Sequence, residues 1–495
     1  MTLIRRVNLA LVVVGSLGLY LFITSAFFVL DFLSVFDAKR ITQLAVFSFI
    51  LLFAVAWPPL RRSTVEQLDR LTALQRVCLA VFFCVGIVSS LRLDHPAYAL
   101  VDVAMMYVLM ILIAVVAASR VMAGKHFDRW AVVSLVAMGF AVAVQELMGF
   151  VAGWAFGTEF SYEQALIHFA HPRFYNQLQT WSIPVIAALP LVFPGKTWIK
   201  LTCTVLLGLQ WFLVISMAAR GTVVSLVTAM VFIALWVPTH RSYWLKYQTL
   251  GVLTGIALYS SALFLNDFLI PKTQLGEVQT GEFYSHSVGR PMMHTSGRNV
   301  LWRIAIEDGL NHPLLGTGPT LYACDQKAIL PAHPHNFLLR IFSEMGAFAA
   351  ILVFVLGASI CVHLLRSFKN ENRRCQTYPP LKTILATSLI AGFLHACFSG
   401  ILIMPASQVT LVLISGWLAG TLAEFTRRKS QTLLLNTALF TGTIIVLSQY
   451  AFAINELRTL PSRINYSADN GVMMPRFWQD GRGCEYENSF YHPTE

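Results

Sequence analysis

Charged residues are scarce in this chain: Asp, Glu, Lys and Arg together make up only 12% of its 495 residues. Soluble globular proteins carry about 25%, so this scarcity excludes an ordinary soluble enzyme. Closely spaced cysteine motifs are also missing. The eight cysteines include no CxxC pair and no metal-like cluster, which argues against a cysteine-based metal site. The chain also has no internal repeat, no low-complexity run and no segment that would form a soluble second domain.

Apolar residues are abundant instead, at 56% of the chain, with a mean hydropathy of +0.63. Apolar runs of roughly 20 residues recur along the whole length, which is the length that crosses a bilayer as a helix. The sequence therefore predicts an all-α polytopic membrane protein. Its net charge of +11 does not indicate nucleic acid, because basic residues that bound apolar spans set topology and meet anionic membrane lipids.

The apolar runs predict about 12–13 transmembrane helices. Basic residues gather in every second connection, starting with Arg5 and Arg6, so the positive-inside rule places the N-terminus in the cytoplasm. The run after Arg6 lacks a small-x-small cleavage site, and we expect a retained first helix. The expected spans lie near residues 9–30, 41–58, 77–91, 97–119, 130–150, 177–194, 198–219, 221–237, 247–265, 337–364, 383–400, 408–426 and 432–453.

This topology divides the chain into four parts. A first helical bundle (1–265) is followed by a long outer loop (266–336), a second bundle (337–453) and an outer tail (454–495). Cys324 and Cys484 are the cysteines that fall on the outer side. They form either a disulfide, if the compartment is oxidising, or two unpaired thiols.

Two outer segments are longer than a turn requires. The first, near 151–176, contains His168, His171 and Arg173. The second is the 266–336 loop, whose start from Asn266 to Gly289 is polar and predicted to be irregular.

The later part of that loop predicts a helix on the membrane surface. Ser296 can cap it, and Gly309 and Pro313 can end it. Its apolar positions, expected to face the membrane, are Val300, Leu301, Ile304 and Ile306.

Four arginines on the outer side are candidates for substrate binding: Arg173, Arg220, Arg298 and Arg303. A charge beside a bilayer is costly without a partner. One interpretation is that each side chain snorkels to lipid phosphate. The other is that they bind a membrane-embedded diphosphate, because a guanidinium holds phosphate oxygens through two hydrogen bonds at once. Function is favoured for Arg220 and Arg298, whereas Arg173 and Arg303 remain balanced between the two interpretations.

His335 is the candidate for proton chemistry, because imidazole titrates near working pH and can accept a proton from an attacking hydroxyl. Its ring could instead contact the diphosphate, or simply serve as a helix cap or interfacial residue. His333 lies two residues away, but no third ligand is evident, so we expect no metal site. Gly316 and Gly318 permit a tight turn, and a phosphate cradle there rests on weak evidence.

Polar residues inside the predicted spans suggest further contacts. Arg340 and Glu344 are four residues apart, which favours an ion pair on one helix face. Gln177 and Gln179 are candidates for lining a cavity, but residues two apart on a helix do not share a face, so at most one is expected to do so.

Several of these residues together resemble the O-antigen ligase and polymerase superfamily. The resemblance rests on Ser296-Gly297-Arg298 with Trp302, on Pro313-Leu314-Leu315-Gly316-x-Gly318, and on His335-Asn336 followed by Gly346. The Arg220-Gly221 step is similar to that family's other arginine site. Ala349 departs from the usual pattern, which has Gly, Thr or Tyr at this place. The motifs cover roughly residues 200–350.

The resemblance implies a polytopic C-type glycosyltransferase of the bacterial inner membrane that works on the periplasmic face. Such a ligase moves O-antigen polysaccharide from undecaprenyl diphosphate to a sugar hydroxyl of lipid A–core, inverting the anomeric centre, with no metal or cofactor. Carried over, Arg220 and Arg298 would bind the diphosphate, and His335, beside Asn336, would activate the acceptor or contact the phosphates. The absence of a DxD motif fits metal independence, and the absence of WWDxG argues against an asparagine-linked oligosaccharyltransferase.

Three alternatives stay open. An O-antigen polymerase or an O-linked protein oligosaccharyltransferase would use the same lipid-linked donor. A secondary transporter or lipid flippase fits the span count, but the spans hold few ionisable residues in their interiors, Asp102 and Glu146 among them, and show no internal repeat.

Overall fold

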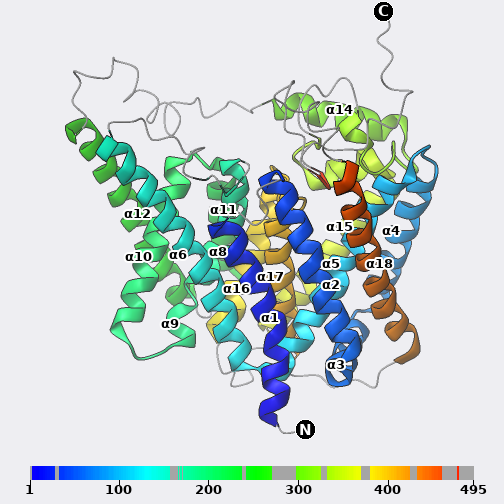
Figure 1. The fold of residues 1–495 in the computed structure, drawn as a ribbon, viewed down its shortest axis with the longest axis horizontal. Coiled ribbons are helices and arrows are strands. Elements are labelled where there is room, and N and C mark those ends of the chain that lie inside the picture. The colour runs from blue at the N-terminus through cyan, green and yellow to red at the C-terminus, as the bar shows by residue number, and fades with distance from the viewer. Residues whose placement is uncertain are drawn as a thin grey trace, which may run out of the picture.

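The protein is a bundle of α-helices, seen in a computed structural model (Figure 1). The structure describes residues 3–27, 33–156, 166, 168–169, 171–236, 241–269, 297–324, 332–369, 379–423, 432–459 and 476–478. Within these ranges the regular structure is entirely helical, which confirms the predicted fold class. Cys484, Ser296 and residues 270–289, which entered the predictions above, lie outside them.

The N-terminal half contributes eleven of the helices. Their bounds are α1 (Leu3–Ala26), α2 (Val35–Ala56), α3 (Pro58–Asp69), α4 (Ala73–Leu91), α5 (Pro96–Ala123), α6 (Lys125–Phe156), α8 (Pro172–Ile186), α9 (Leu189–Val192), α10 (Thr197–Ser216), α11 (Arg220–Trp236) and α12 (Arg241–Leu269). The rest of the chain contributes α14 (Arg298–Asn311), the 3₁₀ turn η1 (Leu321–Cys324), α15 (Phe337–Lys369), α16 (Pro379–His395), α17 (Pro405–Ala423) and α18 (Thr432–Thr459).

Every predicted span corresponds to a helix. Among the described helices, nine are long and apolar enough to cross a membrane: α1, α2, α4, α5, α6, α10, α15, α17 and α18. The other predicted spans correspond to α8 with α9, α11, α12 and α16. Of these, α8 has 15 residues and α11 and α16 have 17 each.

Two local features differ from the prediction, and proline explains both. The expected span at 177–194 breaks after Ile186 and resumes as the short α9, because Pro190 has no N–H to donate to the carbonyl of Ile186, four residues earlier, and its ring would clash with that carbonyl in a continuous helix. The connection expected near residues 59–76 contains α3, which begins at Pro58. Proline is well suited to the first turn of a helix, where its missing N–H has no partner to lose.

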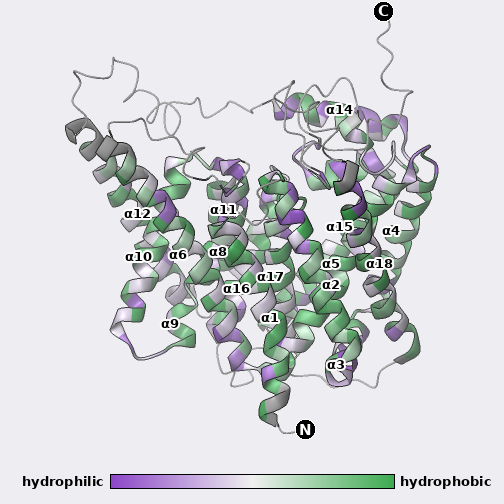
Figure 2. Ribbon diagram, viewed as in Figure 1, coloured by the Kyte–Doolittle hydropathy of each residue, from purple (hydrophilic) through white to green (hydrophobic). Residues whose placement is uncertain are grey.

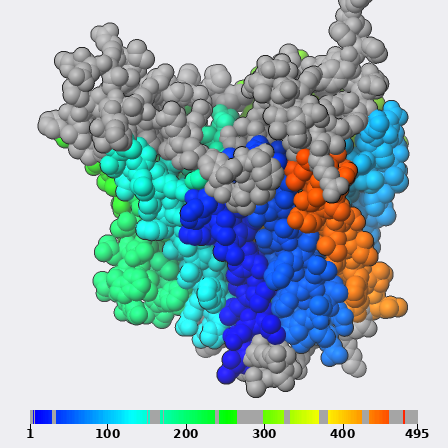
Figure 3. All heavy atoms as spheres, in the orientation of Figure 1, coloured from blue at the N-terminus to red at the C-terminus, as the bar shows by residue number. Residues whose placement is uncertain are grey.

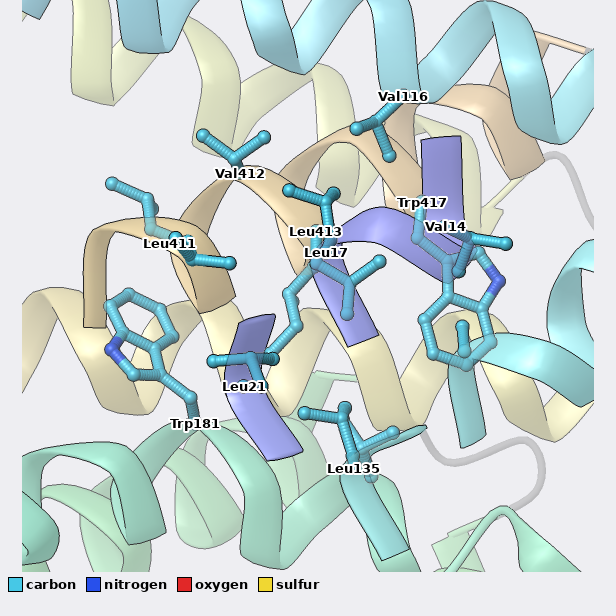
Figure 4. Close-up of a cluster of buried hydrophobic side chains, with 14 of the residues drawn as sticks. Val14, Leu17, Leu21, Val116, Leu135, Trp181, Leu411, Val412, Leu413 and Trp417 are labelled. Carbon is cyan, nitrogen blue, oxygen red and sulfur yellow. The ribbon is translucent and has the colours of Figure 1, made fainter. Parts of the chain in front are cut away.

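The core of the bundle lies where α1, α5, α6, α8 and α17 meet. Figure 4 shows Trp181 and Trp417 at two ends of this cluster, with Leu17 and Leu413 between them. All four side chains are completely buried. Close packing of large apolar side chains from five helices fixes the positions of helices whose outer ends carry the candidate site.

Apolar side chains also cover the outside of the bundle. Figure 2 shows hydrophobic residues along the middle of the helices and hydrophilic ones gathered toward both ends. In Figure 3 the side chains of α1, α2 and α6 close the spaces that separate their ribbons in Figure 1. Exposed apolar residues on long helices are expected where lipid replaces water. Examples are Leu19, Phe49, Phe140, Leu253, Phe354 and Ile444.

The chain start and α14 lie at opposite ends of the bundle (Figure 1). We call the second of these the α14 end. Gly297, with a left-handed backbone (φ 77°), occupies the N-cap position of α14, and the expected cap, Ser296, lies outside the described residues. The helix turns Leu301, Ile304 and Ala305 inward against the protein. Gly309 does not end the helix but lets the ring of Phe342 on α15 approach it closely.

Candidate functional site

The segment Ala332–Asn336 leads into α15 and carries both candidate histidines. His335 has a left-handed backbone (φ 55°), and its N–H donates to Nδ1 of His333 over 3.1 Å. The two ring centroids are 4.3 Å apart. His333 is buried, with 3% of its surface exposed, whereas His335 is only partly buried. His333 therefore supports the backbone of the more accessible His335.

Hydrogen bonds that involve α14 and the residues just after α16 help to hold this segment from outside. The indole Nε1 of Trp302 on α14 donates to the carbonyl of Pro334 over 3.0 Å. The N–H of Phe337 donates to the carbonyl of Ala396, just after α16, over 2.9 Å. The segment is thus fixed to two separate elements, which limits how far His335 can move.

Asn336 caps α15. Its Oδ1 accepts from the N–H of Leu339 over 3.1 Å, and its carbonyl accepts from the N–H of Arg340 over 2.9 Å. An asparagine at this position satisfies amides that a helix start leaves without partners. The structure therefore gives Asn336 a role in orienting the helix that follows His335.

Arg298 and Arg173 lie around His335. Burial, followed by the charges of Arg298 and Arg173, lowers the pKa of His335 to about 3. Burial also lowers the pKa of Arg298, with a contribution from Arg173, although a guanidinium remains charged at any working pH. Two cations thus stand within electrostatic range of each other and of a neutral imidazole, which is an arrangement that attracts an anion.

These two arginines come from helix starts. Arg298 is the first residue of α14, after Gly297. Arg173 lies in the first turn of α8, and its N–H donates to Nδ1 of His171, the N-cap of that helix, over 3.1 Å. Helix starts carry partial positive charge and free N–H groups, so both helices add to the attraction for an anion.

Arg220 is the first residue of α11, and its surroundings connect it with Arg298. The preceding Ala218 has a positive φ of 48°, and the N–H of Arg220 donates to its carbonyl over 2.8 Å. Gly221 packs on His395, because a Cβ at Gly221 would come within 2.9 Å of the imidazole Nε2. His395 lies within electrostatic range of Arg298. The start of α11 is therefore close to His395, a residue on which the charge of Arg298 also acts.

His395 was not predicted from the sequence. It ends α16, is 5% exposed, and its Nδ1 lies 2.7 Å from Oγ1 of Thr180. The hydroxyls of Thr180 and Thr222 both donate to the carbonyl of Asn176, over 3.1 and 3.0 Å. His395 thus ties α8, α11 and α16 together beneath the arginines. One histidine in a mostly apolar run was the available signal, and such a signal is also common in helices without a site.

Arg303 does not join this group. Its side chain is 75% exposed and its Nε pairs with Glu307 one turn along α14, over 3.4 Å. The 100° turn per residue places position 303 on a different side of the helix from position 298. The structure therefore separates the two candidate arginines of α14.

The two glutamines of α8 point in different directions, as their spacing predicted. Gln179 is fully buried, and its Nε2 donates to the carbonyl and the side chain of Gln210 on α10, both over 3.1 Å. Nε2 of Gln177 donates to Oγ of Ser399 over 2.7 Å. Ser399 lines a small cavity beside His333, so of the two glutamines Gln177 lies nearer to the candidate site.

The glycines at 316 and 346 permit backbone to pack on backbone. Gly346 interrupts α15 with φ 85° and ψ 174°, and this kink frees the carbonyls of Ser343 and Glu344. These carbonyls accept from the N–H groups of Thr317 and Gly318 over 2.8 and 3.0 Å. Those amides are therefore occupied, which argues against the phosphate cradle considered from the sequence.

A buried ion network lies behind the histidines. The predicted pair of Arg340 and Glu344 is present, with Nε and Oε2 3.2 Å apart. Arg340 also pairs with Asp102 on α5. Arg476, which is far along the chain, pairs with Glu344 over 2.7 Å and donates to the carbonyl of Ala332 over 3.1 Å. The network thus connects α5, α15 and the tail to the segment that carries His335.

The histidine pair is not accompanied by further metal ligands. Within the described ranges, no group of three His, Cys, Asp or Glu side chains is placed to hold a metal ion. The cavity beside His333 is lined by Asn336, Phe337, Arg340, Ser399, Gly400, Leu402 and Ile403 as well. This lining offers amide, hydroxyl and guanidinium donors, which suit an anion more than a cation.

Comparison with known proteins gives one family. A family model described as O-antigen ligase matches residues 203–354, from α10 to the middle of α15, and this region includes Arg220, Arg298 and His335. A search of curated proteins finds no match to the chain. The family and the long apolar helices together indicate a multi-pass membrane protein of glycosyltransferase type. The resemblance predicted from the motifs is therefore confirmed for residues 203–354, which match the O-antigen ligase family model.

Proposed function

We propose that this protein is an O-antigen ligase that transfers polysaccharide from undecaprenyl diphosphate to a sugar hydroxyl of lipid A–core. The observation that carries the proposal is the meeting of Arg173, Arg298 and a neutral His335 at the α14 end of a membrane bundle. In this proposal the α14 end faces the periplasm of a bacterial inner membrane, where both lipid-linked substrates are accessible.

The arginines bind the donor diphosphate. Arg173 and Arg298 supply guanidinium groups, and the starts of α8 and α14 add backbone N–H dipoles. Arg220, at the start of α11, completes the set. Negative charge builds on the diphosphate as the sugar–oxygen bond breaks, so cations held in place stabilise the transition state more than the ground state.

His335 accepts the proton of the acceptor hydroxyl. The hydroxyl oxygen forms a bond to the anomeric carbon while the bond from that carbon to the diphosphate oxygen breaks, and the electron pair leaves with the diphosphate. Burial and the neighbouring arginines lower the pKa of His335 to about 3. Bound diphosphate offsets those positive charges and raises the pKa toward the range where imidazole works as a base.

The ligase is preferred over the polymerase and the protein transferase because the matching family model is described as O-antigen ligase. The three enzymes share the donor and differ in the acceptor. The proposal for the donor site therefore holds for each of them, whereas the acceptor assignment rests on the family description.

Transfer by purified protein tests the proposal directly. We would mix the protein with undecaprenyl-diphosphate-linked glycan and lipid A–core, add no metal, and measure glycosylated lipid A–core. His335→Ala should lower turnover by about 10²- to 10⁴-fold, the usual contribution of a general base. His335→Gln keeps a hydrogen-bond donor without basicity and should be nearly as impaired. If it were almost fully active, the ring would be a phosphate contact.

Arg298 and Arg303 form a matched pair of variants on one helix. Arg298→Ala should lower kcat/KM by about 10- to 100-fold, as expected for a lost charged hydrogen bond. Arg303→Ala should change it less than about two-fold, because that side chain is exposed and pairs with Glu307. Equal losses in both variants would contradict the donor site proposed here.

A deletion strain identifies the acceptor. Loss of a ligase leaves polymer on undecaprenol and lipopolysaccharide without a ladder on a gel. Loss of a polymerase leaves caps of a single repeat unit, and loss of a protein transferase leaves lipopolysaccharide unchanged. Either of the last two patterns would reject the ligase assignment.

A further inference from the structure

Lys39, near the start of α2, carries a buried amino group that meets no hydrogen-bond acceptor in the part of the chain that the structure describes. It is 6% exposed, and its Nζ has no hydrogen-bond partner within the described structure. The contact found for Nζ is the ring of Phe169, whose centroid is 3.6 Å away. The next residue, Arg40, is also buried, yet its guanidinium donates to the side chains of Gln43 and Gln408 over 2.6 Å.

Lys39 lines a pocket with otherwise apolar walls. The pocket lies between the starts of α2, α8 and α17, and its other lining residues are Val35, Phe36, Phe169, Phe174, Met404, Pro405 and Ala406. α2 runs from the α14 end toward α3 at the opposite end (Figure 1), so the pocket lies toward the α14 end. Phe174 directly follows Arg173, which places this pocket one residue from the proposed donor site.

A buried ammonium without a counter-charge opposes folding, because its lost hydration is not replaced. A phenyl ring recovers part of that loss through its negative face. Intramembrane lysines are rare and usually mark a place where a ligand or partner supplies the missing charge. The apolar walls around Nζ indicate that the ligand combines an anionic group with a hydrocarbon chain.

We propose that this pocket binds the phosphate group of an amphiphilic lipid, with phosphate oxygens accepting from Nζ of Lys39 and the adjoining chain packed on Phe36, Phe174 and Met404. Phosphate offers several acceptor oxygens to one ammonium. His168 lies within electrostatic range of Lys39 and presents an uncharged ring, because burial and then Lys39 lower its pKa. This site is separate from the diphosphate site at Arg298 and does not depend on the proposed reaction.

The test uses purified protein in dodecyl maltoside and three probes: dodecyl phosphate, dodecanol and inorganic phosphate. We expect dodecyl phosphate to raise Tm by at least about 2 °C at a hundred times its half-saturating concentration, and the other two probes to raise it much less. A rise of equal size with dodecanol would overturn the proposal.

Substitutions assign the effect to Lys39. Lys39→Met and Lys39→Gln should lose the rise, and Lys39→Met without probe should melt at or above the wild-type Tm, because it removes an uncompensated charge. A lysine that only supports the fold would give a lower Tm. Lys382→Met is the matched control, since Lys382 is also buried and lies 4.8 Å from the ring of Phe368. It should keep the rise with dodecyl phosphate.

Native mass spectrometry then identifies the source of the phosphate. The protein is placed in phosphatidylcholine nanodiscs that contain undecaprenyl phosphate, lipid A or phosphatidylglycerol, and retained lipid is compared between wild type and Lys39→Met. Retention of undecaprenyl phosphate indicates a donor lipid, that of lipid A an acceptor, and that of phosphatidylglycerol a membrane lipid. Equal retention of every lipid by wild type and variant would reject the site.

Discussion

His333 and His335 both stay neutral in the folded protein, and this has a consequence for acid stability. Burial, together with neighbouring charged groups, lowers the pKa of each ring, to about 3 for His335 and well below 6.5 for His333. In the unfolded chain both rings take up a proton near pH 6.5. Below that pH the unfolded state therefore binds more protons than the folded state, and stability falls as pH is lowered.

We expect Tm in detergent to drop between pH 7 and pH 5, and His333→Asn to make that drop smaller. Asparagine keeps an acceptor near the position of Nδ1, which receives the N–H of His335, but it does not protonate. Melting curves at both pH values for wild type and variant provide the measurement. The same drop in both proteins would mean that His333 is protonated when folded.

At the scale of elements, the kink in α15 decides where this helix and the Pro313–Gly318 loop meet. Gly346 has φ 85° and ψ 174°, a conformation essentially restricted to glycine. A Cβ there would come 2.5 Å from the carbonyl oxygen of Leu314, and one at Gly316 would come 2.2 Å from the backbone of Glu344. Both glycines are therefore required for this close contact.

Gly346→Ala should lower the free energy of unfolding by at least about 2 kcal/mol, because it adds both backbone strain and a clash. Gly357→Ala is the control in the same helix, since a Cβ there meets no atom within 4 Å. It should be neutral or stabilising by up to about 1 kcal/mol. Thermal or denaturant unfolding in detergent compares the two, and similar effects would show that the kink is not a constraint.

The tail acts as a second fixing element through Arg476. Removing this guanidinium in Arg476→Met leaves Glu344 with Arg340 as its remaining cation and frees the carbonyl of Ala332. Breaking such a buried pair costs about 3–5 kcal/mol. Combining Arg476→Met with Glu344→Gln removes both charges and should recover a large part of that loss. A double variant as unstable as the sum of the singles would contradict the coupling.

At the scale of the whole molecule, the arrangement makes a prediction about sidedness. Leu314 lies at the α14 end and is 78% exposed, whereas His126 is an exposed residue near the start of α6. If the α14 end faces the periplasm, Leu314→Cys in a cysteine-free background should react with an impermeant maleimide in intact spheroplasts. His126→Cys should react after permeabilisation. The reverse pattern would place the site in the cytoplasm and exclude periplasmic transfer.

The length and spacing of apolar runs were enough to predict the helices, because a bilayer imposes its thickness on each span separately. Local chemistry likewise indicated Arg298 and His335, which stand beside glycine and proline motifs. The pair of Arg340 and Glu344 was predictable for the same reason, since residues four apart on a helix are neighbours. These features depend on residues close together in the chain, and the sequence by itself determined them.

Contacts between distant segments decided the rest. The tertiary structure brings Arg173 next to Arg298, turns Arg303 away, and buries Arg476 against Glu344. It also packs His395 against Gly221 in the first turn of α11 and leaves Nζ of Lys39 without a hydrogen-bond partner among the described residues. Each of these outcomes depends on which helix faces which, because burial and long-range electrostatics are properties of the packed bundle and are not encoded in any single stretch of sequence.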